Sequence, residues 1–193
     1  MPEDSTAEQR RLLIRLRAKE DIQDALLRYC RGVDRRDFDL MRSAYHPDAT
    51  DDHGGYRGDV SGLIRWVEER HRNVAHSMHF LGNCSIEMAG DEAIVETYCV
   101  VHQRLADKSG SAIATLGFGS AEAGNQMALR CRYIDRFTCR RGEWRIAERV
   151  VVYESVTFER AEEAPFGPEL TVARRDRGDA LYAFTESIGR TPG

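Results

Sequence analysis

The stretch LLRYCRGVDRRDFDLMRSAYHPDAT, residues 26–50, carries much of the information about the fold. Its first part continues a helical pattern with one apolar face. The residues of that face recur at spacings of three and four: Ile22, Ala25, Leu26, Tyr29, Cys30 and Val33. Gly32 weakens this helix near its end, Asp37 is a good N-cap for a short second helix, FDLMRSAY, and Pro47 stops that helix. We therefore expect two consecutive helices here.

Asp34 stands at the end of the first helix, beside its apolar face. If the helix continues through Gly32, Asp34 lies about 40° from Cys30 around the helix axis. A carboxylate at the edge of the buried stripe is partly desolvated, which raises its pKa unless a partner keeps it ionised. A histidine is a suitable partner, because a carboxylate bonded to one ring nitrogen orients the other as a proton acceptor. We take His79 as the candidate partner.

The segments that follow change from helical to strand periodicity. Residues 48–58 predict a short strand and a glycine turn, and residues 61–73 return to helical spacing. Residues 76–107 and 125–158 each contain two strand-like runs around a turn, AGDE or RRGE. Strands of this length favour a strongly bent antiparallel sheet. The chain is therefore predicted to be an α+β cone, a curved sheet wrapped around the N-terminal helices with a pocket inside.

Composition narrows the class of protein. The chain has 193 residues, 41% of them hydrophobic, which fits one globular domain with a real core. A net charge of −4 without a basic block argues against nucleic acid as a partner. No apolar run approaches the roughly 20 residues of a membrane helix, and the N-terminus is too charged for a signal peptide. Five cysteines without a CxxC pair favour free thiols, so we expect a cytoplasmic protein with no membrane partner.

Several other polar side chains are candidates for a site. His53 follows two aspartates, but His76 and His79 are three apart on a strand and face opposite sides, so we expect no metal site. Tyr29 fits either a core aromatic with a bonded hydroxyl or a phenol that holds a substrate oxygen. Arg149 stands in an otherwise apolar run, where a guanidinium could bind a carboxylate through two hydrogen bonds.

The pattern IQDALLRYCRGVDRRDFDLMRSAYHPDATDDHGGYRG, followed by SMHFLGNCSIEMAGDEAIVETY, resembles the SnoaL-like branch of the NTF2-like superfamily. That superfamily includes scytalone dehydratase, the bile-acid 7α-dehydratase, the lindane dehydrochlorinase and ketosteroid isomerase. The resemblance covers roughly residues 8–158. It implies a SnoaL-like domain over residues 1–158 and a C-terminal tail over 159–193, which is a candidate for packing on a neighbouring subunit.

The resemblance also implies roles for individual residues. Asp34 and His79 match the dyad of the dehydratases and the dehydrochlorinase, and Tyr29 matches an active-site tyrosine. An isomerase of this superfamily has a carboxylate near position 53. This chain has a histidine there, which argues against an isomerase. The catalytic set it implies is thus Asp34, His79 and Tyr29. The substrate-binding positions it implies are His53, His102 and Arg149.

These implications together predict a cofactor-independent lyase, a dehydratase or related eliminating enzyme. His79, oriented by Asp34, would remove a proton from a hydrophobic cyclic substrate such as a steroid or polyketide. Tyr29 or His53 would stabilise the developing oxyanion or protonate the departing group. No cofactor is expected, because no nucleotide-binding motif occurs. An isomerase or cyclase, a non-catalytic ligand-binding module and a dioxygenase small subunit remain open, and a homo-oligomer, dimer or trimer, is expected.

Overall fold

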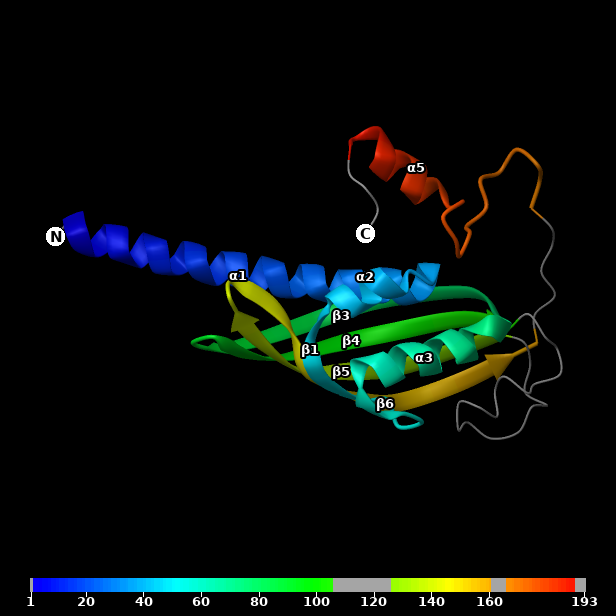
Figure 1. Ribbon diagram of the computed structural model, residues 1–193, viewed down its shortest axis with the longest axis horizontal. Coiled ribbons are helices and arrows are strands. Elements are labelled where there is room, and N and C mark those ends of the chain that lie inside the picture. The colour runs from blue at the N-terminus through cyan, green and yellow to red at the C-terminus, as the bar shows by residue number, and fades with distance from the viewer. Residues whose placement is uncertain (1, 106–125, 161–165, 190–193) are drawn as a thin grey trace.

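The computed structural model describes residues 2–105, 126–160 and 166–189, with side chains from residue 6 onward (Figure 1). Its elements follow one another as the sequence predicts, helices first and long strands second. The helices are α1 (Pro2–Arg35), α2 (Phe38–Ser43), α3 (Val60–Arg70), the 3₁₀ turn η1 (His71–Asn73) and α5 (Ala180–Ser187). The strands are β1 (Tyr45–Asp52), β2 (Arg57–Asp59), β3 (Val74–Ala89), β4 (Glu92–Leu105), β5 (Gln126–Arg140) and β6 (Glu143–Glu159).

The junction between α1 and α2 brings the end of α1 into the core. α1 continues through Gly32, and a Cβ atom there would lie 2.5 Å from the backbone nitrogen of Met41. Only glycine therefore allows α2 to pack this closely on α1. Arg36 takes a positive φ of 55°, which turns the chain, and Asp37 then caps α2 by accepting from the backbone N–H of Leu40 at 3.2 Å. The predicted N-cap is confirmed.

The six described strands form one curved sheet in the order β2-β1-β6-β5-β4-β3. β1 pairs with β6 in parallel, and every other neighbouring pair is antiparallel. Register shifts interrupt the β3–β4 and β5–β6 ladders, and such irregularities bend strands. The helices α1 and α3 cover one face of this sheet (Figure 1), and their apolar residues join the inward residues of the strands in one core. The predicted α+β architecture is confirmed.

The C-terminal segment, residues 166–189, contacts the end of α1 in the same chain. The hydroxyl of Tyr182 donates to Oδ2 of Asp37 at 3.3 Å, and Arg175 donates to the backbone oxygens of Val33 and Asp34 at 3.0 and 2.9 Å. Packing of the tail on a neighbouring subunit stays a prediction. Within the described part of the chain, no helix combines the length and the hydropathy that crossing a membrane requires.

Candidate active site

The carboxylate of Asp34 is bound to His79 through both of its oxygens. Oδ1 accepts from Nδ1 of the His79 ring at 2.7 Å, and Oδ2 accepts from the His79 backbone N–H at 2.8 Å. The hydroxyl of Ser77 also donates to Oδ1, at 2.8 Å. A donating Nδ1–H leaves Nε2 of His79 as the basic nitrogen. Among the described residues no hydrogen-bond partner is recorded for Nε2, which is therefore available to a ligand.

The two members of this pair shift each other's pKa in opposite directions. Burial by itself would raise the pKa of Asp34, but the charge of His79 and the three hydrogen bonds lower it. Burial by itself would lower the pKa of His79, but the attraction of the Asp34 carboxylate and its hydrogen bond raise it. Asp34 thus stays ionised, and His79 becomes a stronger base than an ordinary histidine. This combination suits a general base.

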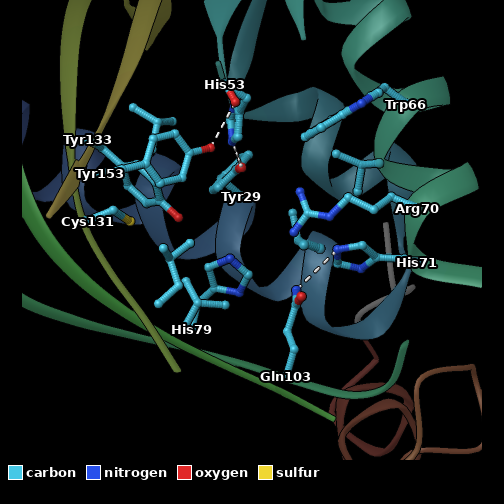
Figure 2. A pocket seen from close by; sticks show the side chains of 15 residues that line it. Tyr29, His53, Trp66, Arg70, His71, His79, Gln103, Cys131, Tyr133 and Tyr153 are labelled. Atoms are coloured by element: carbon cyan, nitrogen blue, oxygen red, sulfur yellow. Dashed lines mark hydrogen bonds between the residues drawn. The ribbon is translucent and has the colours of Figure 1, made fainter. Parts of the chain in front are cut away.

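His79 opens onto a cavity of about 40 Å³ (Figure 2). By this measure the cavity has room for about three water molecules, since one water needs roughly 10–15 Å³. Val33, Val67, Val101, Leu129 and Val151 form its apolar walls. Its polar and aromatic lining comes from α1, the loop after β1, α3, η1 and the long strands: Tyr29, His53, Trp66, Arg70, His71, His79, Gln103, Cys131, Tyr133 and Tyr153. The predicted residues Tyr29, His53 and His79 therefore meet in one cavity.

A second histidine–carboxylate pair lies across the cavity from His79. Nδ1 of His53 is hydrogen-bonded to Oδ1 of Asp51, and Nε2 lies 3.1 Å from the hydroxyl of Tyr29. Asp51 is buried and also accepts from the hydroxyl of Tyr45 at 2.7 Å. With Nδ1–H donating to Asp51, Nε2 of His53 accepts the proton of the Tyr29 phenol. Burial raises the pKa of Tyr29 well above its ordinary value, so this phenol stays protonated.

Arg149 supports this site from beneath and does not line the cavity. Its guanidinium makes two hydrogen bonds to Asp135, both 2.7 Å long, and both side chains are fully buried. It also lies 4.3 Å from the ring centroid of Tyr29 and 4.2 Å from that of Tyr133. The expectation that Arg149 binds substrate therefore needs correction. Asp135 already accepts hydrogen bonds from the two guanidinium nitrogens that would bind a substrate carboxylate. Arg149 instead holds the rings of two cavity tyrosines.

His102 does not reach the cavity either. On β4 the side chains of Val101 and Gln103 are buried and that of His102 is exposed, as strand alternation requires. His102 faces the opposite side of the sheet, in a separate pocket that it shares with His76. The expected placement of His102 in the pocket is therefore wrong. By the same alternation His76 points away from His79, and no group of three or more potential metal-ligating side chains occurs among the described residues.

The sequence analysis missed four polar residues around this site: Asp51, Arg70, Gln103 and Arg175. Alternation along β1 places Asp51 on the same side as Ala49 and His53, and that signal was available in the sequence. Gln103 lies 3.3 Å from His71 (Figure 2) and donates to the hydroxyl of Ser77 at 3.4 Å. Arg175 completes the chain by donating to Nδ1 of His71 at 2.7 Å. No local sequence pattern predicts these contacts, because each joins segments far apart in the sequence.

Fold and cavity define a class: an α+β cone whose interior carries histidines paired with carboxylates and phenols. The chain belongs to the SnoaL-like domain family, whose model matches residues 15–150. Curated relatives include uncharacterized proteins of Mycobacterium tuberculosis H37Rv and Mycobacterium bovis, each 32% identical over 82 residues. That match covers 41% of this chain and 56% of each relative. The chain thus spans little more than half the length of these relatives.

Solved structures share the fold at low identity. The dehydrochlorinase LinA-type3 of Novosphingobium barchaimii superposes with a TM-score of 0.63 at 19% identity, over 81% of this chain and 98% of that one. A Novosphingobium aromaticivorans protein provisionally named a scytalone dehydratase gives 0.62 at 14%, over 78% and 93%. A Nostoc punctiforme protein of unknown function with a cystatin-like fold gives 0.54 at 17%, over 70% and 90%. At these identities the likeness shows the fold alone.

Proposed function

We propose that the protein is a lyase in which His79 removes a proton from the substrate and a leaving group departs from the neighbouring carbon. One observation carries the proposal: Asp34 fixes Nδ1 of His79, while the opposite nitrogen is left for the cavity. The same lining includes the Tyr29 phenol, so a base and a proton donor serve one small volume. The structural likeness to a dehydrochlorinase agrees with elimination as the reaction class.

The reaction would proceed through groups that are already in position. Nε2 of His79 takes the proton, and the electrons of the broken C–H bond form the new double bond. The leaving group departs with its own bonding pair. The O–H of Tyr29 turns from Nε2 of His53 to hydrogen-bond to it. Before the substrate binds, the Asp51–His53 pair holds that phenol, because Nε2 of His53 accepts its proton. General acid–base catalysis of this kind typically contributes about 10²–10⁴ in rate, and positioning in a dry cavity supplies the rest.

The size of the cavity bears on the substrate. Pockets that bury drug-sized ligands occupy roughly 300–1,000 Å³. The cavity here measures about 40 Å³, so a steroid or polyketide would enter only if side chains such as Trp66 and Tyr153 moved aside. This favours a substrate of few non-hydrogen atoms, smaller than the cyclic compounds suggested by the family resemblance.

The proposal is tested by screening small compounds that carry a leaving group next to an acidic C–H bond. Loss of the leaving group would be followed by mass spectrometry, and uptake of solvent deuterium by NMR. We expect the wild type to eliminate at least one such compound, and Asp34→Asn and His79→Gln to lose nearly all of that rate. His102→Gln is the matched control, since this exposed histidine lies on the outer face. Turnover that survives in both dyad variants would contradict the proposal.

An isomerase is the second candidate, and one observation favours it. The protonated phenol of Tyr29 is as well suited to hold an enolate oxygen as to assist a leaving group. An isomerase would return the proton from His79 to a different carbon of the same molecule. The deuterium experiment separates the two reactions, because isomerisation leaves the substrate's composition unchanged apart from exchanged hydrogen, whereas elimination releases a second product.

A further inference from the structure

Arg70 brings a positive charge to the cavity without a matching anion. It is the last residue of α3, and its guanidinium lies among the lining side chains, over the ring of Trp66 at 4.9 Å from the centroid (Figure 2). Among the described residues no carboxylate pairs with Arg70, and its buried Nε has no hydrogen-bond partner. The side chain thus stacks on one aromatic ring, and its Nε–H donates to no described residue.

Such an arrangement is unfavourable unless it serves a ligand. A buried charge without a partner costs stability, and proteins normally pair it with an opposite charge. This chain does so elsewhere: Arg149, which is fully buried, has Asp135 on two of its nitrogens, whereas Arg70 is half-buried. At Arg70 the groups that interact electrostatically with the guanidinium are instead phenols, those of Tyr153, Tyr29 and Tyr133. The missing partner is an anion.

The neighbours of Arg70 leave the position open for that anion. His71 is adjacent, but burial, Arg70 and Arg175 all lower its pKa, so it is neutral and adds no charge. The Asp34 carboxylate is already occupied by His79 and Ser77. An incoming anion therefore meets the Arg70 guanidinium, and no carboxylate is among the described residues that line the cavity. The planar fork of arginine matches the two oxygens of a carboxylate.

We propose that Arg70 binds the carboxylate of a small organic acid and thereby positions the rest of that acid against His79. The inference rests on the proposed function for the reaction, but not for the binding. With the carboxylate on Arg70, the remaining atoms extend toward Tyr29 and His79, which line the same cavity. The chemical class of the substrate is then an acid of few carbon atoms with a leaving group.

Binding can be measured without turnover. Acetate and propionate would be titrated at constant ionic strength, with acetamide and propionamide as neutral compounds of nearly the same shape. The indole N–H signal of Trp66 in ¹H–¹⁵N spectra reports on the site, because Arg70 stacks on that ring. We expect the acids to bind at least tenfold more tightly than the amides. Equal binding of acid and amide, or no binding of either, would overturn the proposal.

Variants then locate the binding group. Arg70→Gln and Arg70→Met should each weaken acid binding at least tenfold, while Arg65→Gln, on the exposed side of the same helix, should leave it unchanged. Arg70→Met should also melt at a higher temperature than the wild type without ligand, because it removes a half-buried cation whose Nε has no partner among the described residues. Unchanged acid binding in Arg70→Gln, or a lower melting temperature in Arg70→Met, would contradict the assignment.

The experiment also separates this inference from the lyase proposal. His79→Gln keeps Arg70 and should retain acid binding even though it cannot remove a proton. Acid binding without any turnover in the wild type would leave the Arg70 site standing and count against the lyase. Turnover of neutral compounds only, with no preference for acids, would keep the lyase and remove the carboxylate site.

Discussion

Both oxygens of the Asp34 carboxylate are bonded to His79, a residue 45 positions further along the chain: Oδ1 to the ring at 2.7 Å and Oδ2 to the backbone N–H at 2.8 Å. The backbone contact fixes the carboxylate relative to β3, and the ring contact then fixes the imidazole relative to the carboxylate. Nε2 consequently has one direction, toward the cavity. A base that is oriented before the substrate arrives loses little entropy when it reacts.

The first prediction concerns the pH dependence of the proposed reaction. A general base must be neutral to act, so kcat/KM should rise with pH through the pKa of His79. Asp34 raises that pKa, so the rise of kcat/KM should lie at a pH above the ordinary histidine value of about 6.5. Asp34→Asn removes the carboxylate that raises the pKa of His79, while burial and Arg70 still lower it. The rise of kcat/KM should therefore move to a pH below about 6.5. We also expect kcat to fall about 10²–10⁴-fold. A rise of kcat/KM at the same pH in both proteins would contradict the pairing.

The second prediction concerns stability against pH. The raised pKa of His79 stabilises the folded state fully below its ordinary pKa, and this contribution disappears as pH rises through the folded value. The lowered pKa of Asp34 stabilises above its own ordinary value, and that contribution is lost as pH falls through the folded value. The melting temperature of the wild type should therefore decline from mildly acidic to alkaline pH more than that of His79→Gln. If the melting temperatures of the two proteins changed with pH in the same way, the Asp34–His79 pair would not contribute to the pH dependence of stability.

The third prediction concerns the buried pair Arg149–Asp135. Asp135→Asn removes the negative charge from a guanidinium that has no access to solvent, and we expect it to cost about 3–5 kcal/mol in the free energy of unfolding. Glu154→Gln, which weakens the exposed pair with Arg132, should cost far less, because solvent screens that pair. Urea unfolding of both variants measures the difference. Equal losses would mean that burial of the Arg149 pair carries no special weight.

The fourth prediction concerns the close approach of α2 to α1. In Gly32→Ala the new Cβ would lie within 2.5–2.7 Å of backbone and side-chain atoms of Met41, so α2 must move. Overpacking of this kind costs roughly 1–3 kcal/mol. Gly82→Ala is the control, because its Cβ meets nothing nearer than 3.7 Å, and it should change stability by about 0.5 kcal/mol or less. Thermal unfolding of the two variants decides between them.

The fifth prediction concerns the C-terminal segment. Arg175 donates to the carbonyl of Asp34 at 2.9 Å, and it reaches Ser77 through His71 and Gln103. Arg175→Ala should therefore loosen the end of α1 and lower the rate of the proposed reaction more than it lowers substrate affinity. Arg174→Ala removes only an exposed contact with Asp176 and should leave both unchanged. The ring signals of His79 in NMR spectra report the loosening directly, and identical signals in Arg175→Ala would rule it out.

Local periodicity was sufficient to predict much of this site. The helical spacing of Tyr29 and Val33 placed Asp34 at the edge of the buried face, and the structure has it there. His79 was predicted from that geometry together with the family resemblance. His102 was placed wrongly because the resemblance selected a strand, whereas alternation along the strand decides which side chains face inward. Asp51 could have been found by the same alternation, which puts it beside His53.

The contacts that the sequence could not reveal are long-range ones. Arg149 was recognised as unusual, but its partner Asp135 lies on the neighbouring strand, and only the register of β5 with β6 brings them together. Arg70 ends a helix among other charged residues and differs from them only in where its guanidinium points. Arg175 lies about a hundred residues from every group it binds in η1 and β3. Pairings of this kind depend on tertiary packing and leave no short-range pattern.

The titration of His79 also reports whether α1 is packed against β3. The carboxylate of the Asp34–His79 pair comes from a helix and its imidazole from a strand, and neither element alone brings the two within reach. A loosened state that kept every helix and strand but let α1 drift from β3 would have normal far-ultraviolet circular dichroism and an ordinary, unshifted histidine. The titration of a single imidazole would therefore reveal the loss of close packing before spectroscopic signals of secondary structure changed.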